Sequence, residues 1–139
     1  MPTFDDIKND YNNLGIEFEM RSEDSIKTDS LLVFDYEYPE SLAEVVIDTD
    51  EFTAMCPWTG LPDFGTLKIQ YVPDKLALEL KSLKYYLLSF SNVGMVQEHV
   101  VNKILKDLTS ICLPINMNIH LDYNVRGGLH TSVTVNFEK

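Results

Sequence analysis

The sequence predicts a single α+β domain in which four antiparallel strands carry two helices on one face. Three observations lead to this class. Residues 66–72 alternate apolar and polar side chains, which is the period of a half-buried strand. Residues 96–112 repeat apolar side chains at helical spacing. Near the C-terminus, Arg126-Gly127-Gly128 is a two-glycine hairpin turn.

The N-terminal quarter contains the weakest signals. Residues 1–30 are rich in Asp, Asn, Glu and Ser, and predict an arm with little structure of its own. Short strands are expected at 31–34 and from 44 to 49. We therefore divide the single domain, residues 1–139, into this arm and a core that spans 44–139.

The core elements follow in order along the chain. The strand at 66–72 ends at the turn Pro73-Asp74, and a second strand at 76–80 is expected to form a hairpin with it. Ser82 is a candidate N-cap for a helix that runs to about residue 90, and the longer helix at 96–112 ends before a proline.

Two further strands, 116–123 and 129–137, complete the predicted sheet on either side of the glycine turn. From residue 66 the order is strand, strand, helix, helix, strand, strand. A sheet this small has exposed edges that must be paired or covered, so oligomerisation is expected.

Composition excludes several classes of function. The net charge of −11 argues against binding nucleic acid through a general electrostatic field. The sequence has no apolar run long enough to span a membrane and no signal peptide at its N-terminus, so we expect a cytoplasmic protein with no membrane partner. Its three histidines and two cysteines do not form a metal-ligand pattern, so no metal is expected.

A cysteine lies in the turn-rich segment 55–65, which reads Met-Cys-Pro-Trp-Thr-Gly-Leu-Pro-Asp-Phe-Gly. Prolines and glycines constrain the backbone around Cys56, and Asp63 follows seven residues later. These residues favour a thiol nucleophile with a carboxylate for proton transfer. The alternative is structural, with Cys56 as a small buried residue and Asp63 as a turn cap. The other cysteine, Cys112, lies on the apolar stripe of the longer helix and is assigned to the core.

Four segments resemble the NADPH-dependent 7-cyano-7-deazaguanine reductases, the nitrile reductases of queuosine biosynthesis. They are the nucleophile segment 52–64, the run Glu-Leu-Lys-Ser-Leu-Lys-Tyr-Tyr at 79–86, the start of the second helix with Phe90, Asn92, Gly94 and Glu98, and the hairpin turn at 126–128. The similarity spans about residues 50–130. The resemblance implies the tunnelling fold, in which subunits join edge to edge into barrels and active sites lie at subunit interfaces. It also implies a homo-oligomer that binds a small 7-deazaguanine base and uses NADPH.

The resemblance implies a role for each matching residue. Cys56 would attack the nitrile carbon to give a covalent thioimide, Asp63 would transfer protons, and Glu98 would hold the N–C–N edge of the base, because a carboxylate accepts two parallel N–H bonds. Further contacts to the base are expected from Leu78, Glu79, Ser82, Val96 and Gln97, and contacts to cofactor phosphates from Lys81, Lys84, Arg126 and Gly127. The structural alternatives are a favourable charge in the first turn of a helix for Glu98 and an ordinary solvated face for the two lysines.

Four positions depart from the family pattern, which reads Phe-Arg-Asn-His-Gly and then Phe-His-Glu. Ser91 stands where arginine is expected, Val93 and Gln97 where histidines are, and Val96 where an aromatic residue is. Glutamine cannot act as a general acid, and valine offers no π face to a base. The sequence therefore predicts nitrile reduction with a weakened proton supply. The alternatives are a non-reducing relative, either an amidinotransferase or a decarboxylase acting on a 7-cyano or 7-carboxy base, including one that serves DNA modification, or a non-catalytic tunnelling-fold binding subunit.

Overall fold

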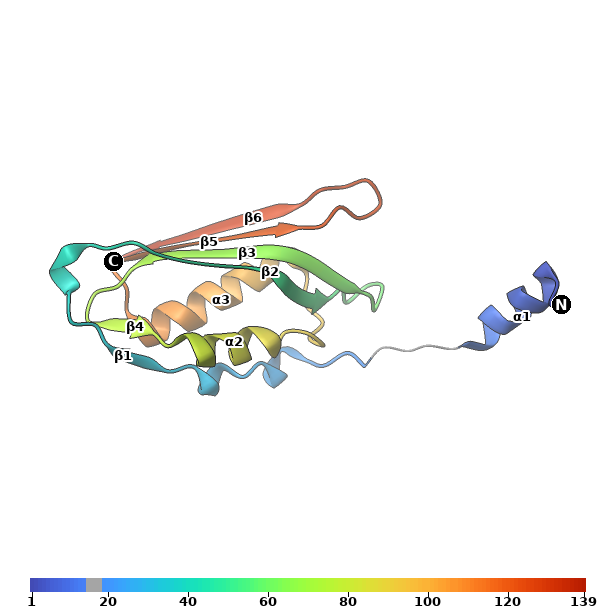
Figure 1. Cartoon of the computed structure of the whole chain (residues 1–139), viewed down its shortest axis with the longest axis horizontal. Helices are drawn as coiled ribbons and strands as arrows, with labels where there is room; N and C mark the ends of the chain where they lie inside the picture. Colours follow the sequence, from blue (N-terminus) through green and yellow to red (C-terminus); the bar gives the residue numbers. More distant parts are fainter. Residues whose placement is uncertain (15–18) are drawn as a thin grey trace.

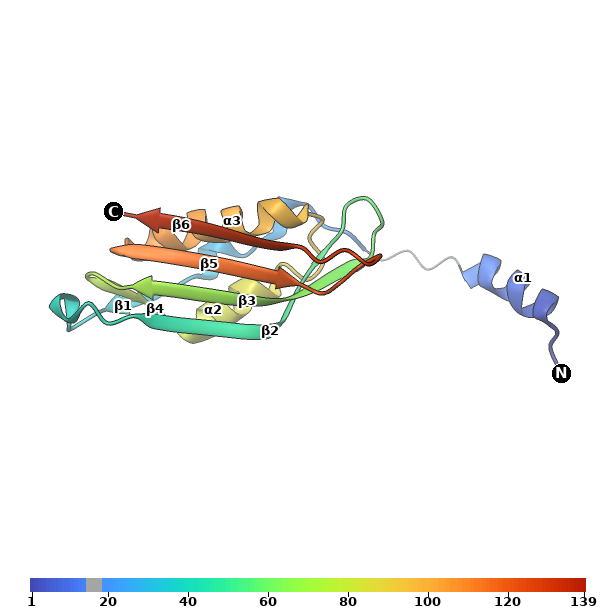
Figure 2. The same ribbon diagram turned by 90° about the horizontal axis from the view of Figure 1, so that it is seen from above.

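The computed structural model describes residues 1–14 and 19–139 (Figure 1). Its body has two layers, a four-stranded antiparallel sheet and two helices that pack on one face (Figure 2). In spatial order the sheet consists of β2 (Val45–Met55), β3 (Pro62–Val72), β5 (Asn116–Tyr123) and β6 (Ser132–Glu138). The helices are α2 (Leu80–Leu88) and α3 (Gln97–Cys112). The predicted class, with two helices on one face of a four-stranded sheet, is confirmed.

The core lies between the sheet and the helices because the strands alternate. On β3, Leu67, Ile69 and Tyr71 are buried, while the alternating residues Thr66 and Lys68 are exposed on the other face. The central strand β5 repeats this pattern. From the helical layer, α3 contributes its apolar stripe, and the buried residues of that stripe are Val100, Val101, Ile104, Leu108 and Cys112.

One predicted strand pairing is wrong. The strand β4 (Leu76–Leu78) pairs with β1 (Val33–Asp35) in a separate two-stranded sheet and does not form a hairpin with β3. The reason is that both edges of β3 are occupied, by β2 on one side and β5 on the other. The predicted four-stranded sheet therefore contains β2 in the place expected for residues 76–80.

The start of α2 also differs from the prediction. Its N-cap is Glu79 rather than Ser82, and the Glu79 carboxylate accepts hydrogen bonds from the backbone N–H groups of Lys81 and Ser82 at 2.9 and 2.7 Å. The strand ends two residues earlier than expected because the chain has already entered the helix by Leu80. Buried Ser82 donates instead to the Glu79 carbonyl at 2.8 Å and accepts from the Leu32 N–H at 2.9 Å.

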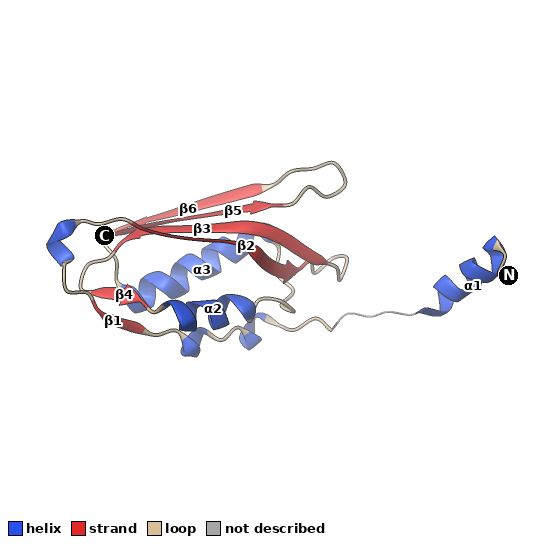
Figure 3. Cartoon of the chain, viewed as in Figure 1, coloured by secondary structure: helices blue, strands red, loops and turns tan. Residues whose placement is uncertain are grey.

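The N-terminal arm contains more structure than its composition indicates. It includes the helix α1 (Phe4–Leu14) and two short 3-10 turns, Glu23–Ser25 and Thr28–Ser30, and a third, Pro39–Ser41, follows β1 (Figure 3). The chain contacts the core on both sides of the second turn, where Ile26 and Leu31 are buried. None of the helices in the described part of the chain is long and apolar enough to cross a membrane.

Candidate active site

The loop between β2 and β3 holds Cys56 at one end of the sheet. The two strands pair as far as Met55 and Pro62, and the loop closes through hydrogen bonds from the Cys56 N–H to the Leu61 carbonyl and from the Gly60 N–H to the Cys56 carbonyl, both at 2.9 Å. Gly60 has φ of +69°, a left-handed conformation that glycine adopts without steric cost. The sequence therefore presents the thiol from a closed turn.

Asp63 is the second residue of β3, and its side chain points inward rather than capping the turn. Only 3% of the residue is exposed. Its carboxylate forms an ion pair with the Arg126 guanidinium, and the other end of that guanidinium approaches the Thr59 hydroxyl at 3.4 Å. The proposed acid/base and the glycine turn thus meet, although they are 63 residues apart in the sequence.

The first turn of α3 reaches the same place because its approach segment is tied to β2. The Met55 N–H donates to the Val93 carbonyl at 2.9 Å, and the Met95 N–H donates to the Met55 carbonyl at 3.1 Å. The helix begins two residues after Met95, so Gln97 and Glu98 lie beside the cysteine loop. The buried Tyr123 hydroxyl donates to the Gln97 carbonyl at 3.1 Å and fixes this end of α3 to β5.

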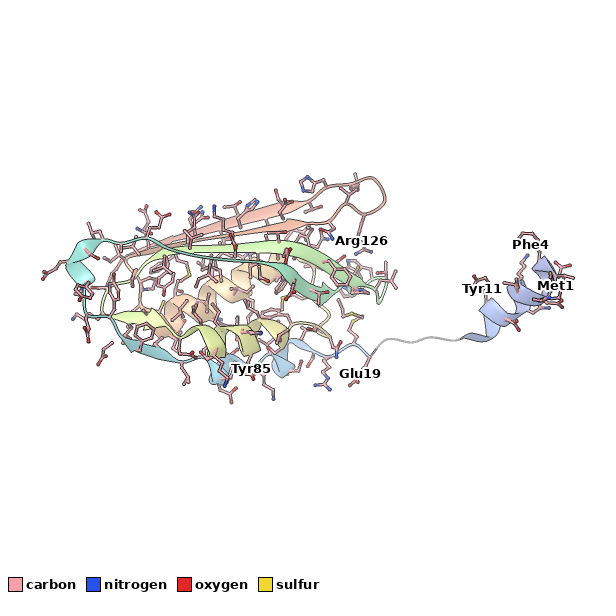
Figure 4. The ribbon with its side chains drawn as sticks, in the orientation of Figure 1. Met1, Phe4, Tyr11, Glu19, Tyr85 and Arg126 are labelled. Carbon is pink, nitrogen blue, oxygen red and sulfur yellow. The ribbon has the colours of Figure 1, made fainter. Side chains whose placement is uncertain are left out.

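These elements enclose a cavity of ≈ 410 Å³. Figure 4 shows Arg126 at the end of the sheet where the β2–β3 loop lies, whereas Tyr85 lies on α2 in the helical layer. The volume is within the range of small-molecule sites. Its lining residues are Cys56, Pro57, Trp58, Asp63, Val96, Gln97, Glu98, Asn124, Arg126, Gly127, Leu129 and Thr131.

The cavity favours the thiolate form of Cys56. Burial opposes ionisation, but hydrogen bonds from the Thr59 side chain and from the backbone of Thr59 and Trp58, together with Arg126, outweigh it and lower the pKa of the thiol. The same guanidinium gains from the contact, because its hydrogen bonds to Asp63 and Cys56 raise the pKa of Arg126. A cysteine with a depressed pKa beside a carboxylate is a suitable nucleophile.

Seven of the twelve predicted site residues line this cavity, and five do not. The five lie at the start of α2 and just before it. Leu78 and Ser82 are buried within the chain, and Glu79 is engaged as the helix cap. Lys81 and Lys84 are exposed on α2. Within one chain, the cysteine loop and the Glu79–Lys84 segment are therefore separate regions.

A second hollow, of ≈ 280 Å³, lies between α2 and the edge strand β2, and we call it the α2 groove. It is lined by Lys84 and by Ser91, with apolar walls from Ile47, Phe52, Leu83 and Leu87. One of the predicted phosphate ligands therefore has a hollow beside it, although not the hollow that contains Cys56.

The four departures from the family pattern fall in three different places. Val93 is fully buried and belongs to the core, and Ser91 lines the α2 groove. Only Val96 and Gln97 line the cavity with Cys56. The cavity therefore loses an aromatic face and a histidine, and no histidine lines it among the residues that the structure describes.

Several cavity residues were missed by sequence reasoning. Thr59 contacts both Cys56 and Arg126, and its position three residues after the cysteine in a turn is the signal that could have revealed it. Trp58 is 82% exposed at the cavity, and a lone tryptophan beside a candidate nucleophile could have been noted as well. Asn124, Leu129 and Thr131 have no local signal, since only the β5–β6 hairpin brings them to the cysteine.

Comparisons with known proteins identify the family of the chain. A family model described as "QueF-like protein" matches residues 62–139. The NADPH-dependent 7-cyano-7-deazaguanine reductase of Chlorobaculum tepidum is 50% identical over 107 residues, which cover 77% of this chain and 92% of that protein. The enzyme of the same name from Caldicellulosiruptor bescii is 46% identical over 122 residues, which cover 88% of this chain and 93% of that protein.

Among solved structures, the apo form of the archaeosine synthase QueF-Like resembles the chain with a TM-score of 0.63. The match covers 67% of this chain and 91% of that one, at 16% sequence identity. A likeness at this identity concerns the fold, and it confirms the tunnelling fold expected from the motifs.

Proposed function

The chain belongs to the family of NADPH-dependent 7-cyano-7-deazaguanine reductases, and we propose that it reduces the nitrile of 7-cyano-7-deazaguanine to the aminomethyl group with two equivalents of NADPH. The relatives that are about half identical to the chain have the reductase name. Their similarity favours reduction over the amidinotransferase and decarboxylase alternatives.

One observation supports this function most strongly. A cysteine with a lowered pKa and a buried aspartate from the β2–β3 segment line one cavity together with a glutamate from the first turn of α3. Core packing does not require these three polar groups to converge. Covalent capture of a nitrile requires a nucleophile, a proton carrier and a means of orienting the base, and Cys56, Asp63 and Glu98 supply these in turn.

The addition step follows from the positions of these groups. Asp63 accepts the thiol proton of Cys56, the sulfur forms a bond to the nitrile carbon, and the displaced π-electron pair goes to nitrogen. The same proton then passes from Asp63 to that nitrogen, which leaves a thioimide on Cys56 and a carboxylate on Asp63. Glu98 orients the base by accepting its N–H groups, and the N-terminus of α3 favours a negative charge there.

Reduction of the thioimide requires a hydride donor, and NADPH supplies hydride when it is bound. Of the residues that line the cavity, Arg126 fits a phosphate group, because its guanidinium is the cavity's cation and 38% of its side chain is exposed. Gly127 beside it presents backbone without a Cβ, so a ligand can approach closely. Lys81 and Lys84 are exposed cations that suit the same role from α2.

We also propose that the active protein is a homo-oligomer whose interfaces complete the site. The edge strands β2 and β6 each have one unpaired side in the single chain. The Glu79–Lys84 segment lies away from the cavity of its own subunit, so a second copy is needed to bring it to the base. Residues 1–139 form one domain in this assembly, with 1–30 as an arm and 44–139 as the core.

The test combines covalent capture with turnover. The purified chain is mixed with 7-cyano-7-deazaguanine, and intact-protein mass spectrometry should show a mass increase of one base per subunit. Addition of NADPH should then consume two equivalents per nitrile and remove the adduct. An adduct that forms without any NADPH oxidation would favour a non-reducing relative, and the absence of both would overturn the proposal.

A further inference from the structure

Arg126 lies where it can contact both the Asp63 carboxylate and a ligand at the opening of the cavity. Its guanidinium pairs with the Asp63 carboxylate, approaches Thr59 at 3.4 Å and hydrogen-bonds to the Cys56 thiol, while 38% of its side chain remains exposed. It is carried by the turn between β5 and β6, where Gly127 and Gly128 have φ of +57° and +79°. One cation therefore faces both the proton carrier and the open mouth of the cavity.

The position of Arg126 beside Asp63 matters because the reaction needs a supply of protons. Conversion of the thioimide to the amine consumes two hydrides and two protons. Both hydrides add to the carbon, one proton adds to the nitrogen, which already carries the former thiol proton, and the other restores the Cys56 thiol as the C–S bond breaks. Both protons come from solvent after the thioimide has formed. Gln97 cannot supply them. Of the lining residues, Asp63 and Glu98 are the two carboxylic groups, and Glu98 is assigned to the base. Asp63 must therefore be reloaded with a proton for each hydride.

A paired guanidinium opposes that reloading, because an adjacent positive charge favours the carboxylate over the acid. The same pair assists the first step, in which Asp63 must begin as a carboxylate so that it can accept the proton of the Cys56 thiol. The two stages of the reaction thus require opposite arrangements of one ion pair. A cation that leaves Asp63 between the stages satisfies both requirements.

We propose that Arg126 is shared between the two stages: it holds Asp63 as a carboxylate during thioimide formation, and a phosphate of the bound cofactor then draws it away so that Asp63 can take up protons. This inference rests on the proposed function and adds a coupling between cofactor binding and proton supply. The chemistry that recruits Arg126 is that of a phosphate group, which accepts bidentate hydrogen bonds from a guanidinium.

Several charged and titratable groups surround Asp63 and would contribute to the pH dependence of thioimide formation. The Cys56 thiol faces it from the β2–β3 loop, Arg126 from the β5–β6 turn, Tyr123 from β5 and Glu98 from α3. Burial, with Asp63 and Glu98 nearby, raises the pKa of Tyr123, so this phenol stays neutral across the working range. The fall in the rate of thioimide formation at low pH, which we call the acidic limb, therefore reports protons taken up by the other groups of this cavity.

The experiment measures the rate of thioimide formation against pH, with and without saturating NADP⁺, which cannot reduce the adduct. In the natural protein, NADP⁺ should move the acidic limb to higher pH by about one unit, because it removes a neighbouring cation. In Arg126→Gln the limb should already lie at the higher pH, and NADP⁺ should move it far less. The Kd for NADP⁺ should rise roughly tenfold or more, as expected for a lost charge-assisted hydrogen bond.

Two further variants complete the design. Arg126→Lys keeps the charge and should restore part of the NADP⁺-dependent shift, which a purely structural role of the side chain would not predict. Arg21→Gln removes an exposed arginine that pairs with Glu19 outside the cavity, and it should leave the limb unchanged. Circular dichroism and light scattering confirm that each variant is folded and assembled as the natural protein is.

The outcomes separate the two proposals. Equal NADP⁺ shifts in the natural protein and Arg126→Gln would mean that the phosphates act directly on the Cys56–Asp63 pair, and a natural protein without any shift would mean that no coupling exists. Either result would overturn the shared role while leaving the reductase function intact. Failure of the natural protein to form the adduct would overturn both.

Discussion

The two cysteines of this chain show how placement decides chemistry. Cys56 lies in the β2–β3 loop at the mouth of a cavity, where a threonine, two backbone groups and a guanidinium surround its sulfur and lower its pKa. Cys112 is the last residue of α3 and is fully buried, and burial raises its pKa to about 12. The first is prepared to be a thiolate and the second to remain a small apolar side chain.

The difference comes from the elements that carry the two residues. Cys112 ends the apolar stripe of α3, which packs into the core, so its neighbours are mainly apolar. A closed turn instead leaves backbone N–H groups and a threonine hydroxyl directed at the sulfur of Cys56. Proximity of Asp63 and Arg126 then adds proton transfer and charge, which the helical site cannot supply.

Removal of the Cys56 thiol should have the largest effect on the difference between the two cysteines. Cys56→Ala should abolish covalent capture of 7-cyano-7-deazaguanine, because no other group in the cavity can form the thioimide. Intact-protein mass spectrometry checks this, with Cys112→Ala as the matched control, which should retain the adduct at one base per subunit. A base that remains attached to Cys56→Ala would show that the nucleophile has been misassigned.

A second test uses ionisation alone. Thiolates, not thiols, react with iodoacetamide, and between an ordinary thiol and one with a pKa of about 12 the thiolate fraction at neutral pH differs by a factor of roughly 10³. Cys56 should therefore be alkylated at least that much faster than Cys112 in the folded protein. As pH rises, the Cys56 rate should reach half its maximum below the usual cysteine range, whereas Cys112 should react only on unfolding.

Peptide mapping after timed alkylation measures both rates in one sample. Addition of denaturant is the control, since it should bring the two rates together by removing both environments. Comparable rates in the folded protein would contradict the difference between the two sites.

Removing the proton carrier should have the next largest effect. Asp63→Asn keeps the shape of the side chain but cannot accept the thiol proton, so the rate of thioimide formation should fall by roughly 10²- to 10⁴-fold. Stopped-flow absorbance of the adduct measures the rate. Asp122→Asn is the matched control. Asp122 lies on β5, pairs with His130 and does not line the cavity, so its substitution should change the rate little. An unchanged rate in Asp63→Asn would remove this residue from the mechanism.

Much of the fold could be predicted from the sequence because periodicity is local. The longer helix was predicted to within one residue, and β5 at both ends, since their apolar repeats run uninterrupted to clear breaks. The pairing of β4 was wrong because both neighbours of β3 come from distant segments, β2 and β5, and local patterns do not reveal which edge is already occupied. The cap at Glu79 was missed because a carboxylate can replace a serine there.

The candidate site shows the same difference between local patterns and contacts between distant segments. Cys56 and Asp63 could be predicted because one closed turn holds both, and the motif resemblance supplied Glu98 and Arg126. The contact between Asp63 and Arg126 could not, since it spans 63 residues and depends on the register of β3 against β5. The placement of the Glu79–Lys84 segment away from the cavity could not be predicted either, because a motif records which residues are present but not where the fold places them.

The smallest predicted effect concerns the supply of protons from position 97 beside Cys56. Gln97 lines the cavity at the position where the family pattern has histidine, and it supplies no proton. Gln97→His should leave thioimide formation unchanged, because Asp63 already serves that step, and should raise the rate of NADPH oxidation by about tenfold, the lower part of the range for a positioned general acid. The gain should appear below the pKa of the new imidazole and fade as pH rises through it, since only the imidazolium can donate. His99→Gln, which changes an exposed helical neighbour, is the control and should alter neither rate. If Gln97→His also left NADPH oxidation unchanged at every pH, proton supply through Asp63 would already be sufficient, and the missing histidine would not limit this cavity.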